Sequence, residues 1–194
     1  MRSSNDHYSF GYNLSSLRQA IKDGYAPEFV FFWSGKEVNE RAVGPECLSQ
    51  WYPASFSVGD TTYSTAEHFM MAEKARIFGD RVVLQRILKA PSPKKAKQLG
   101  RQVRGFDEQT WVQERLAVAV RGNQAKFQQN ERLRRYLIET EERVLAEASP
   151  HDSVWGIGLS ATDVRAPDPF QWEGQNLLGF AVMRVRAVLS RVRS

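Results

Sequence analysis

The chain has 194 residues, of which 42% are hydrophobic and 11% aromatic, a composition typical of one globular domain with its own core. Its 27 lysines and arginines outnumber 22 aspartates and glutamates, and the resulting net charge of +5 favours anionic ligands. Cys47 is the single cysteine, which excludes an intrachain disulfide and a cysteine cluster that could hold zinc or an iron–sulfur centre.

The longest apolar stretches, residues 29–33 and 116–120, are much shorter than the ~20 residues that a membrane-spanning helix requires. The N-terminal residues are polar and contain no hydrophobic segment of the kind found in a secretory signal. A single cysteine also suits a reducing compartment. We therefore expect a cytoplasmic protein without a membrane partner.

Residues 1–28 are interpreted as an N-terminal extension, and residues 29–194 as the domain. Within the extension, Leu14, Leu17 and Ile21 have helical spacing, which predicts one short amphipathic helix. The rest of the chain has no internal repeat, no low-complexity tract and no linker rich in proline, glycine and serine. These features indicate a single domain.

The domain is predicted to begin with a short buried strand. Residues 29–33 are aromatic or β-branched, and the Ser34-Gly35 pair that follows favours a turn. A second strand is predicted over residues 55–58, where Gly59-Asp60 is a typical hairpin turn and leads into a third strand at residues 61–63.

The remainder is predicted to be helical, apart from one long irregular segment. N-cap residues and apolar periodicity predict helices over residues 66–77, 81–88, 92–100, 106–127, 131–147 and 176–192. Residues 149–175 are rich in glycine, proline and aspartate, which is typical of a site loop or of a disordered segment. The expected fold class is therefore mainly α with a minor β component.

Basic residues are concentrated in two segments. Residues 89–104 contain Lys89, Lys94, Lys95, Lys97, Arg101 and Arg104 with no acid between them, and Arg184, Arg186, Arg191 and Arg193 close the chain. Two interpretations remain open for each segment. It is either a solvated helix face or a surface that contacts the phosphates of a nucleotide or nucleic acid.

Several catalytic templates are missing from the sequence, including a P-loop, a glycine-rich dinucleotide fingerprint and a Gly-x-Ser-x-Gly elbow. His7, His68 and His151 are isolated from one another, so the pattern predicts neither a metal site nor a cofactor. What remains is carboxylates beside aromatic residues. This combination directs attention to residues 63–75 and 151–158.

Glu67, Met71 and Lys74 fall on one stripe of the predicted helix, which places an acid and a base together. Alternatively, Glu67 only complements the dipole of the helix N-terminus. Asp152 stands near Trp155 in a glycine-containing segment that suits a platform for a nucleobase. The alternative for Asp152 is an ordinary turn residue.

In their order, these segments resemble the NADAR superfamily of YbiA-like proteins. The Tyr63–Lys74 segment is similar to the family's T-S-E-H-Y-F-Q-A-Q-K helix, although Ala66, Met71 and Glu73 depart from it. The other matching segments are Phe32-Trp33-Ser34, Leu48-Ser49-Gln50-Trp51, Trp111, Lys126-Phe127, Asp152-x-x-Trp155-Gly156-x-Gly158, Asn176-Leu177-Leu178-Gly179 and Met183-Arg184-x-Arg186. The resemblance spans about residues 29–188, and it implies a single-domain YbiA-like helical fold.

The resemblance implies hydrolysis of an N-glycosidic bond, and the residue pattern predicts no cofactor for it. The family's substrates are phosphoribosylamino-pyrimidine intermediates of riboflavin synthesis and ADP-ribosyl groups attached to guanine, so the expected partner is a small phosphoribosyl or ADP-ribosyl molecule, or a nucleic acid that carries ADP-ribose. Both substrates have a bond between C1 of a ribose and a nitrogen. Hydrolysis passes through an oxocarbenium-like state, which a carboxylate near C1 stabilises.

The resemblance also implies roles for individual residues. Glu67 is expected to be the principal catalytic carboxylate, and Asp152 a second one that orients the ribose hydroxyls or the water. Lys74 is expected to keep Glu67 ionised or to contact phosphate. The predicted substrate-binding residues are Trp33, Ser34, Trp111, Glu147, Trp155, Gly156 and Asn176, among which Trp111 and Trp155 would stack on the base and Glu147 is a third candidate carboxylate.

The main alternative from another functional class is a non-catalytic module that binds ADP-ribose or nucleic acid through the same pocket. The presence of both Glu67 and Asp152 favours the enzyme, because a binder of an anionic ligand has little need of a buried carboxylate facing that ligand.

Overall fold

The computed structural model describes residues 10–33 and 43–191. In chain order, the elements of these ranges are α1 (Leu14–Lys22), β1 (Phe29–Phe32), η1 (Pro45–Leu48), β2 (Phe56–Val58), β3 (Thr61–Tyr63), α2 (Ala66–Ile77), α3 (Arg81–Leu88), α4 (Pro93–Gly100), α5 (Glu108–Gln129), α6 (Glu131–Glu139), β4 (Val144–Glu147), η2 (Pro169–Gln171) and α7 (Leu177–Arg191). The prediction of a mainly α fold with a minor β component is confirmed. None of the helices within the described ranges is long and apolar enough to cross a membrane.

Each of the helices α1 to α5 is preceded by a polar residue whose side chain accepts a hydrogen bond from a backbone N–H group of the first helical turn. Asn13, Thr65, Asp80, Ser92 and Asp107 cap α1 to α5 in this way. The caps satisfy backbone N–H groups that have no partner within the helix, so these helices start close to the positions that the sequence predicts.

The prediction of one helix over residues 131–147 is wrong for the second half of that range. α6 ends at Glu139, Glu141 has a left-handed φ of 48°, and residues 144–147 form β4, which pairs in parallel with β1. Residues 144–146 are all fully buried. An amphipathic helix leaves one face to solvent, whereas a parallel strand that is covered on both faces buries successive residues. The uninterrupted apolar run therefore belongs to a strand.

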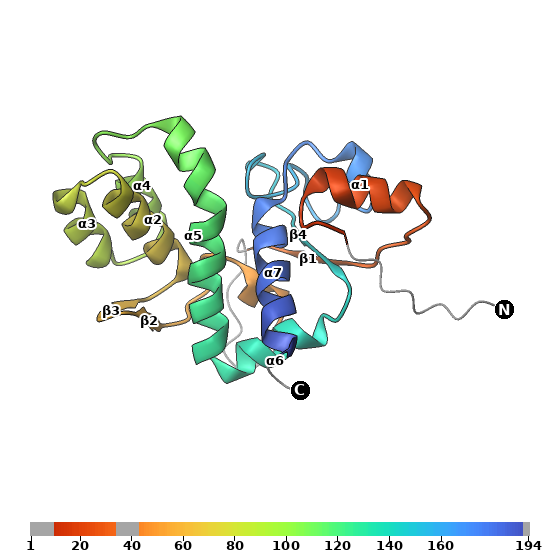
Figure 1. The fold of residues 1–194 in the computed structure, drawn as a ribbon, viewed down its shortest axis with the longest axis horizontal. Coiled ribbons are helices and arrows are strands. Elements are labelled where there is room, and N and C mark those ends of the chain that lie inside the picture. Colours follow the sequence, from red (N-terminus) through yellow and green to blue (C-terminus); the bar gives the residue numbers. More distant parts are fainter. Residues whose placement is uncertain (1–9, 34–42, 192–194) are drawn as a thin grey trace.

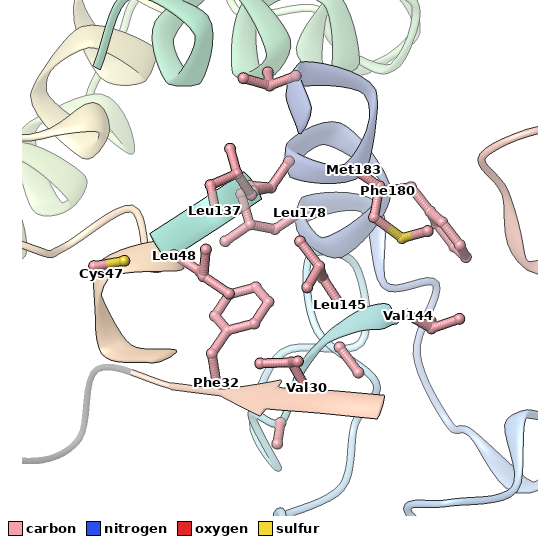
Figure 2. Close-up of a cluster of buried hydrophobic side chains, with 14 of the residues drawn as sticks. Val30, Phe32, Cys47, Leu48, Leu137, Val144, Leu145, Leu178, Phe180 and Met183 are labelled. Atoms are coloured by element: carbon pink, nitrogen blue, oxygen red, sulfur yellow. The ribbon is translucent and has the colours of Figure 1, made fainter. Parts of the chain in front are cut away.

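Two clusters of buried side chains form the core. The first surrounds β1 and β4, and Figure 2 shows Phe32, Leu145 and Leu178 within it. The second lies among α2, α3, α4 and the β2–β3 hairpin. α5 runs between the two groups of elements in Figure 1 and packs against α7 and α2. Trp155 contacts both clusters, which places the segment after β4 at their junction.

The predicted amphipathic helix of the N-terminal extension is α1. Its residue Leu17 has no exposed surface and belongs to the first cluster. The Arg18 guanidinium donates a hydrogen bond through Nε to the carbonyl oxygen of Pro169 at 2.9 Å, in η2. α1 is thus packed on the irregular segment that precedes α7, as Figure 1 shows.

Candidate active site

A cavity of about 520 Å³ opens at the junction of the two clusters. Its wall combines the first turns of α2, one face of α4, the end of β4 and the loop that follows β4. The lining residues are Trp33, Gln50, Trp51, Glu67, Met70, Met71, Lys94, Lys97, Gln98, Arg101, Trp111, Glu147, Ser149, His151, Asp152, Trp155 and Leu178. The cavity is therefore lined by acids, bases and four tryptophans.

Glu67 lies in the first turn of α2 and is only 2% exposed. Its backbone N–H donates to the carbonyl oxygen of Gln50 at 3.0 Å, and its Oε1 is buried without a hydrogen-bond partner. Burial raises the pKa of Glu67 to about 7, although the charge of Lys97 and a hydrogen bond from the Trp51 side chain lower it. A carboxylate that merely complemented a helix dipole would lie in solvent, so this environment favours the functional interpretation.

Glu147 is the last residue of β4 and reaches the same cavity. Its Oε2 is also buried without a hydrogen-bond partner. Burial, followed by the negative charge of Asp152, raises the pKa of Glu147 to about 8. Glu67 contributes to this rise, whereas Lys97 opposes it. Two carboxyl groups with raised pKa values thus line one cavity.

Asp152 is a turn residue that also lies at the cavity wall. Its Oδ1 accepts hydrogen bonds from the backbone N–H groups of Val154 and Trp155, at 3.1 and 2.8 Å, which builds the turn. Its Oδ2 lies 3.7 Å from Nζ of Lys97 at the cavity wall. The turn therefore holds one carboxylate oxygen and leaves the other to interact with a cation in the site.

The positive charges of the site come from α4 and from the residue that follows it. Lys94, Lys97 and Arg101 line the cavity, and Lys97 and Arg101 both lower the pKa of Glu67. Lys74 does not line the cavity; its Nζ lies 4.0 Å from the centre of the Phe106 ring and 5.7 Å from that of Trp111, which does line it. The place beside Glu67 that the sequence suggested for Lys74 is taken by residues from the basic segment 89–104.

In the second basic segment, Arg186 makes hydrogen bonds within the fold. Nη1 of Arg186 donates hydrogen bonds to Oγ1 of Thr140 and to the carbonyl oxygen of Arg143, both at 2.8 Å. Arg186 is 7% exposed and stabilises the connection between α6 and β4. Arg193 lies outside the described residues.

Four tryptophans surround the cavity. Trp33 is 47% exposed, whereas Trp111 and Trp155 are half-buried and also pack against the core clusters. Trp51, which is not among the predicted binding residues, lies in a segment that resembles the family and lines the cavity. Ser34, a predicted substrate-binding residue, lies outside the described residues.

Asn176 and Gly156 lie behind the cavity wall and do not line it. The Asn176 side chain donates to the Leu145 carbonyl oxygen at 2.9 Å and accepts from the Glu147 N–H at 3.0 Å. A Cβ on Gly156 would lie 2.8 Å from the carbonyl oxygen of Glu147 and 3.0 Å from that of Asp152. These two residues therefore position the carboxylates that the cavity presents.

Lys126 belongs to a segment that resembles the family, but no role was predicted for it, since a lysine within a long helix is normally solvated. It is fully buried in α5, and its Nζ donates to the carbonyl oxygens of Cys47 at 2.7 Å and Ser49 at 2.8 Å. Burial lowers its pKa to about 8. Lys126 fixes the segment that carries Gln50 and Trp51 into the cavity.

Within residues 10–33 and 43–191, no group of three or more histidine, cysteine, aspartate or glutamate side chains has a geometry that could hold a metal ion. The titratable side chains at the cavity wall are three carboxyls, cations of α4 and His151. The tryptophans and the cations suit an anionic ligand that has an aromatic group, and the buried carboxyl groups would face that ligand.

Comparisons with known proteins identify the family of this chain and its fold. The NADAR domain family matches residues 31–190. An N-glycosidase of Acanthamoeba polyphaga mimivirus is 37% identical over 164 residues, which cover 82% of this chain and 95% of that protein. A riboflavin biosynthesis protein of Vibrio vulnificus is 30% identical over 142 residues, or 73% of this chain and 35% of that protein. The solved structure of the E. coli protein YbiA has the same fold, with a TM-score of 0.68, 24% sequence identity and coverage of 87% of this chain and 89% of its own.

Proposed function

The chain belongs to the NADAR domain family, and from this we propose that it is an N-glycosidase that hydrolyses the bond between C1 of a ribose and a nitrogen. The observation that carries the proposal is the buried, unpaired Oε1 of Glu67 at the wall of the cavity. The mimivirus relative, which is named an N-glycosidase, supports the same chemistry.

The cavity supplies the groups that this chemistry requires. A carboxylate beside C1 stabilises the positive charge of an oxocarbenium-like transition state, and Glu67 is the residue proposed for this role. Asp152, held by its turn, would orient the ribose hydroxyls or the attacking water. Trp111 and Trp155 would stack on the departing base.

We infer that the substrate carries phosphate. Lys94, Lys97 and Arg101 face the cavity, and ammonium and guanidinium groups bind phosphate oxygens through charge-assisted hydrogen bonds. Two substrate classes fit: a phosphoribosylamino-pyrimidine intermediate of riboflavin biosynthesis, and ADP-ribose attached to guanine. The first draws support from the Vibrio vulnificus relative, although the shared region is 35% of that protein.

A second candidate function is a module that binds ADP-ribose or nucleic acid without catalysis. The tryptophans and cations would serve such a module equally well. The unpaired carboxyl oxygens argue against it, because burying a polar group without a partner costs ~1–3 kcal/mol and a negative charge repels an anionic ligand. Binding of ADP-ribose by the wild-type protein without hydrolysis of either substrate class would support the module.

The test of the enzyme is Glu67→Gln, which keeps the size of the side chain and removes its charge. Turnover is expected to fall at least ~100-fold, which corresponds to about 2.7 kcal/mol of transition-state stabilisation. Release of ribose 5-phosphate is followed for the pyrimidine substrate, and release of ADP-ribose for ADP-ribosylated guanine. Near-normal turnover in Glu67→Gln would rule out this assignment.

Glu73→Gln is the matched control for this experiment. Glu73 is a second, largely buried carboxylate of α2, but it pairs with Arg76 and Arg121 and does not line the cavity. The control variant should lose some stability and keep its turnover. A loss of turnover shared by Glu67→Gln and Glu73→Gln would indicate a general disturbance of α2.

A further inference from the structure

Two carboxyl groups present a buried oxygen without a hydrogen-bond partner at the same cavity, Oε1 of Glu67 and Oε2 of Glu147. We propose that Glu147 is a second catalytic residue, a general acid that donates a proton to the departing nitrogen while Glu67 carries the negative charge. This inference rests on the proposed N-glycosidase function and assigns the proton that the reaction requires.

Three hydrogen bonds fix the backbone of Glu147. Its N–H donates to Oδ1 of Asn176 at 3.0 Å, and its carbonyl oxygen accepts from the N–H groups of Ile157 at 2.8 Å and Ser149 at 2.9 Å. A side chain at the end of such a strand is positioned more precisely than one on a free loop. Glu67 approaches from α2, in the other core cluster, so the two carboxyls enter the cavity from different parts of the fold.

The charges around the pair favour one shared proton. The charges of Asp152, Lys97 and Glu67 change the pKa of Glu147. Those of Lys97, Asp152 and Arg101 change the pKa of Glu67. The remaining titratable groups on the cavity wall are Lys94 and His151. Burial raises both carboxyl pKa values, to about 8 for Glu147 and about 7 for Glu67. Near neutral pH two carboxyls with such raised pKa values share about one proton, and the proposal places that proton on Glu147, whose pKa is raised further.

The proposed step conserves atoms and charge. The bond between C1 and nitrogen breaks, its electron pair stays on nitrogen, and the proton of Glu147 moves to that nitrogen. Water attacks C1 and gives a proton to Glu67, so the products are the free amine or base and a ribose with a hydroxyl at C1. Glu67 ends protonated and Glu147 ionised, and a proton passed through solvent restores the starting state.

The experiment compares two ribosyl probes that differ in the leaving group. The amine of a phosphoribosylamino-pyrimidine must be protonated to leave, whereas the phenolate of 4-nitrophenyl β-D-ribofuranoside 5-phosphate leaves without a proton. Glu147→Gln is expected to lower kcat/KM at least ~100-fold on the amine probe and to stay within about fivefold of wild type on the nitrophenyl probe. Glu67→Gln should lower kcat/KM on both probes.

The pH profile of the wild-type protein gives a readout that needs no variant. An alkaline decline of kcat/KM is expected with the amine probe, because Glu147 loses its proton, and this decline should be absent with the nitrophenyl probe. Equal losses on both probes in Glu147→Gln, or an identical alkaline decline with both probes in the wild type, would overturn the assignment. A wild-type protein that hydrolyses neither probe nor ADP-ribosylated guanine would instead overturn the proposed glycosidase function.

Discussion

At the scale of single residues, Glu67 illustrates a cost that the site imposes on stability. Burial raises its pKa from an ordinary value of 4.5 to about 7. Because the pKa is higher in the folded protein than in the unfolded chain, the stability contributed by the protonated group is fully present below about pH 4.5 and is lost as the pH rises through about 7. The buried Glu67 carboxyl is thus expected to weaken the fold at neutral and alkaline pH, a cost that the proposed catalytic role would explain.

Glu67→Gln should therefore gain stability relative to the wild type as the pH rises. The difference in the free energy of unfolding is expected to change by on the order of 3 kcal/mol between about pH 5 and about pH 8, because glutamine does not ionise. Denaturant unfolding across this range measures the difference. Glu73→Gln, which removes an ion-paired carboxylate, should show no such gain. A difference between Glu67→Gln and wild type that does not vary with pH would contradict the raised pKa.

Replacement by phenylalanine should have different effects on the Tm at Trp111 and at Trp155. Trp111 packs against the second cluster only, whereas Trp155 packs against both. Trp111→Phe is expected to weaken substrate binding with a change in Tm below ~2 °C. Trp155→Phe should weaken binding and also lower Tm by several degrees, since about 1 kcal/mol shifts Tm by ~2–4 °C in a chain of this size. Titration calorimetry and thermal melts check both values, and unchanged binding in Trp111→Phe would assign that residue to packing alone.

At the scale of elements, the close approach of α7 to β4 depends on a glycine. A Cβ on Gly179 would lie 2.1 Å from the backbone carbonyl oxygen of Leu145, so the helix could not keep its place on the strand. Gly179→Ala is expected to destabilise the protein by ~2–4 kcal/mol. Gly11→Ala is the control, because the nearest atoms to a Cβ there are 3.7 Å away. Chemical denaturation gives both values, and a loss below ~0.5 kcal/mol for Gly179→Ala would contradict the packing described.

The sequence predicted those elements whose signals are local. The side chains that cap α2 and α4 mark their starts, and Gly59-Asp60 marks the hairpin between β2 and β3. β4 was missed because Val144-Leu145-Ala146 is a short apolar run that also suits a helix, and only its pairing with β1 decides between them. Pairing with β1 thus determines the secondary structure of residues 144–147, and the helical spacing of their apolar side chains does not.

The positions of the candidate site residues could be predicted only in part. Glu67, Asp152, Trp111 and Trp155 are brought together at one cavity as their segments suggested. The sequence could not predict that Lys97, and not Lys74, lies at the cavity with the carboxyl groups. The position of Lys97 depends on which face of α4 packs toward them. Spacing within one helix orders residues on its surface, but it does not say which neighbouring helix covers them.

At the scale of the whole molecule, the cavity lies where two separately packed clusters meet. Glu67 comes from the cluster around α2, and Glu147 from the one around β1 and β4. α5 connects the two, since Lys126 in this helix holds the segment that carries Trp51 while Trp111 reaches the cavity itself. The placement of these two carboxyls relative to each other therefore depends on the complete fold.

The charge of the whole molecule bears on the size of the substrate. The net charge is +5, and the basic segment 89–104 has residues on both sides of α4. Lys97 lines the cavity, whereas Lys95 is exposed and does not line it. A small phosphoribosyl substrate would use only the residues within the cavity, while ADP-ribose on a guanine within a strand would also bring phosphates to the outer ones.

A salt series with matched variants should therefore distinguish the two substrates. Binding of a single strand that carries ADP-ribosylated guanine is expected to fall with a log–log slope of about −0.7 for each phosphate contacted, and Lys95→Ala should make that slope shallower. Lys97→Ala should raise KM for both substrates, because it faces the cavity. A pyrimidine substrate should show a shallow slope that Lys95→Ala does not change. Preference for this small substrate, together with indifference to Lys95→Ala on the strand, would mean that the outer part of the basic segment is a solvated helix face and that the site recognises a single phosphoribosyl group.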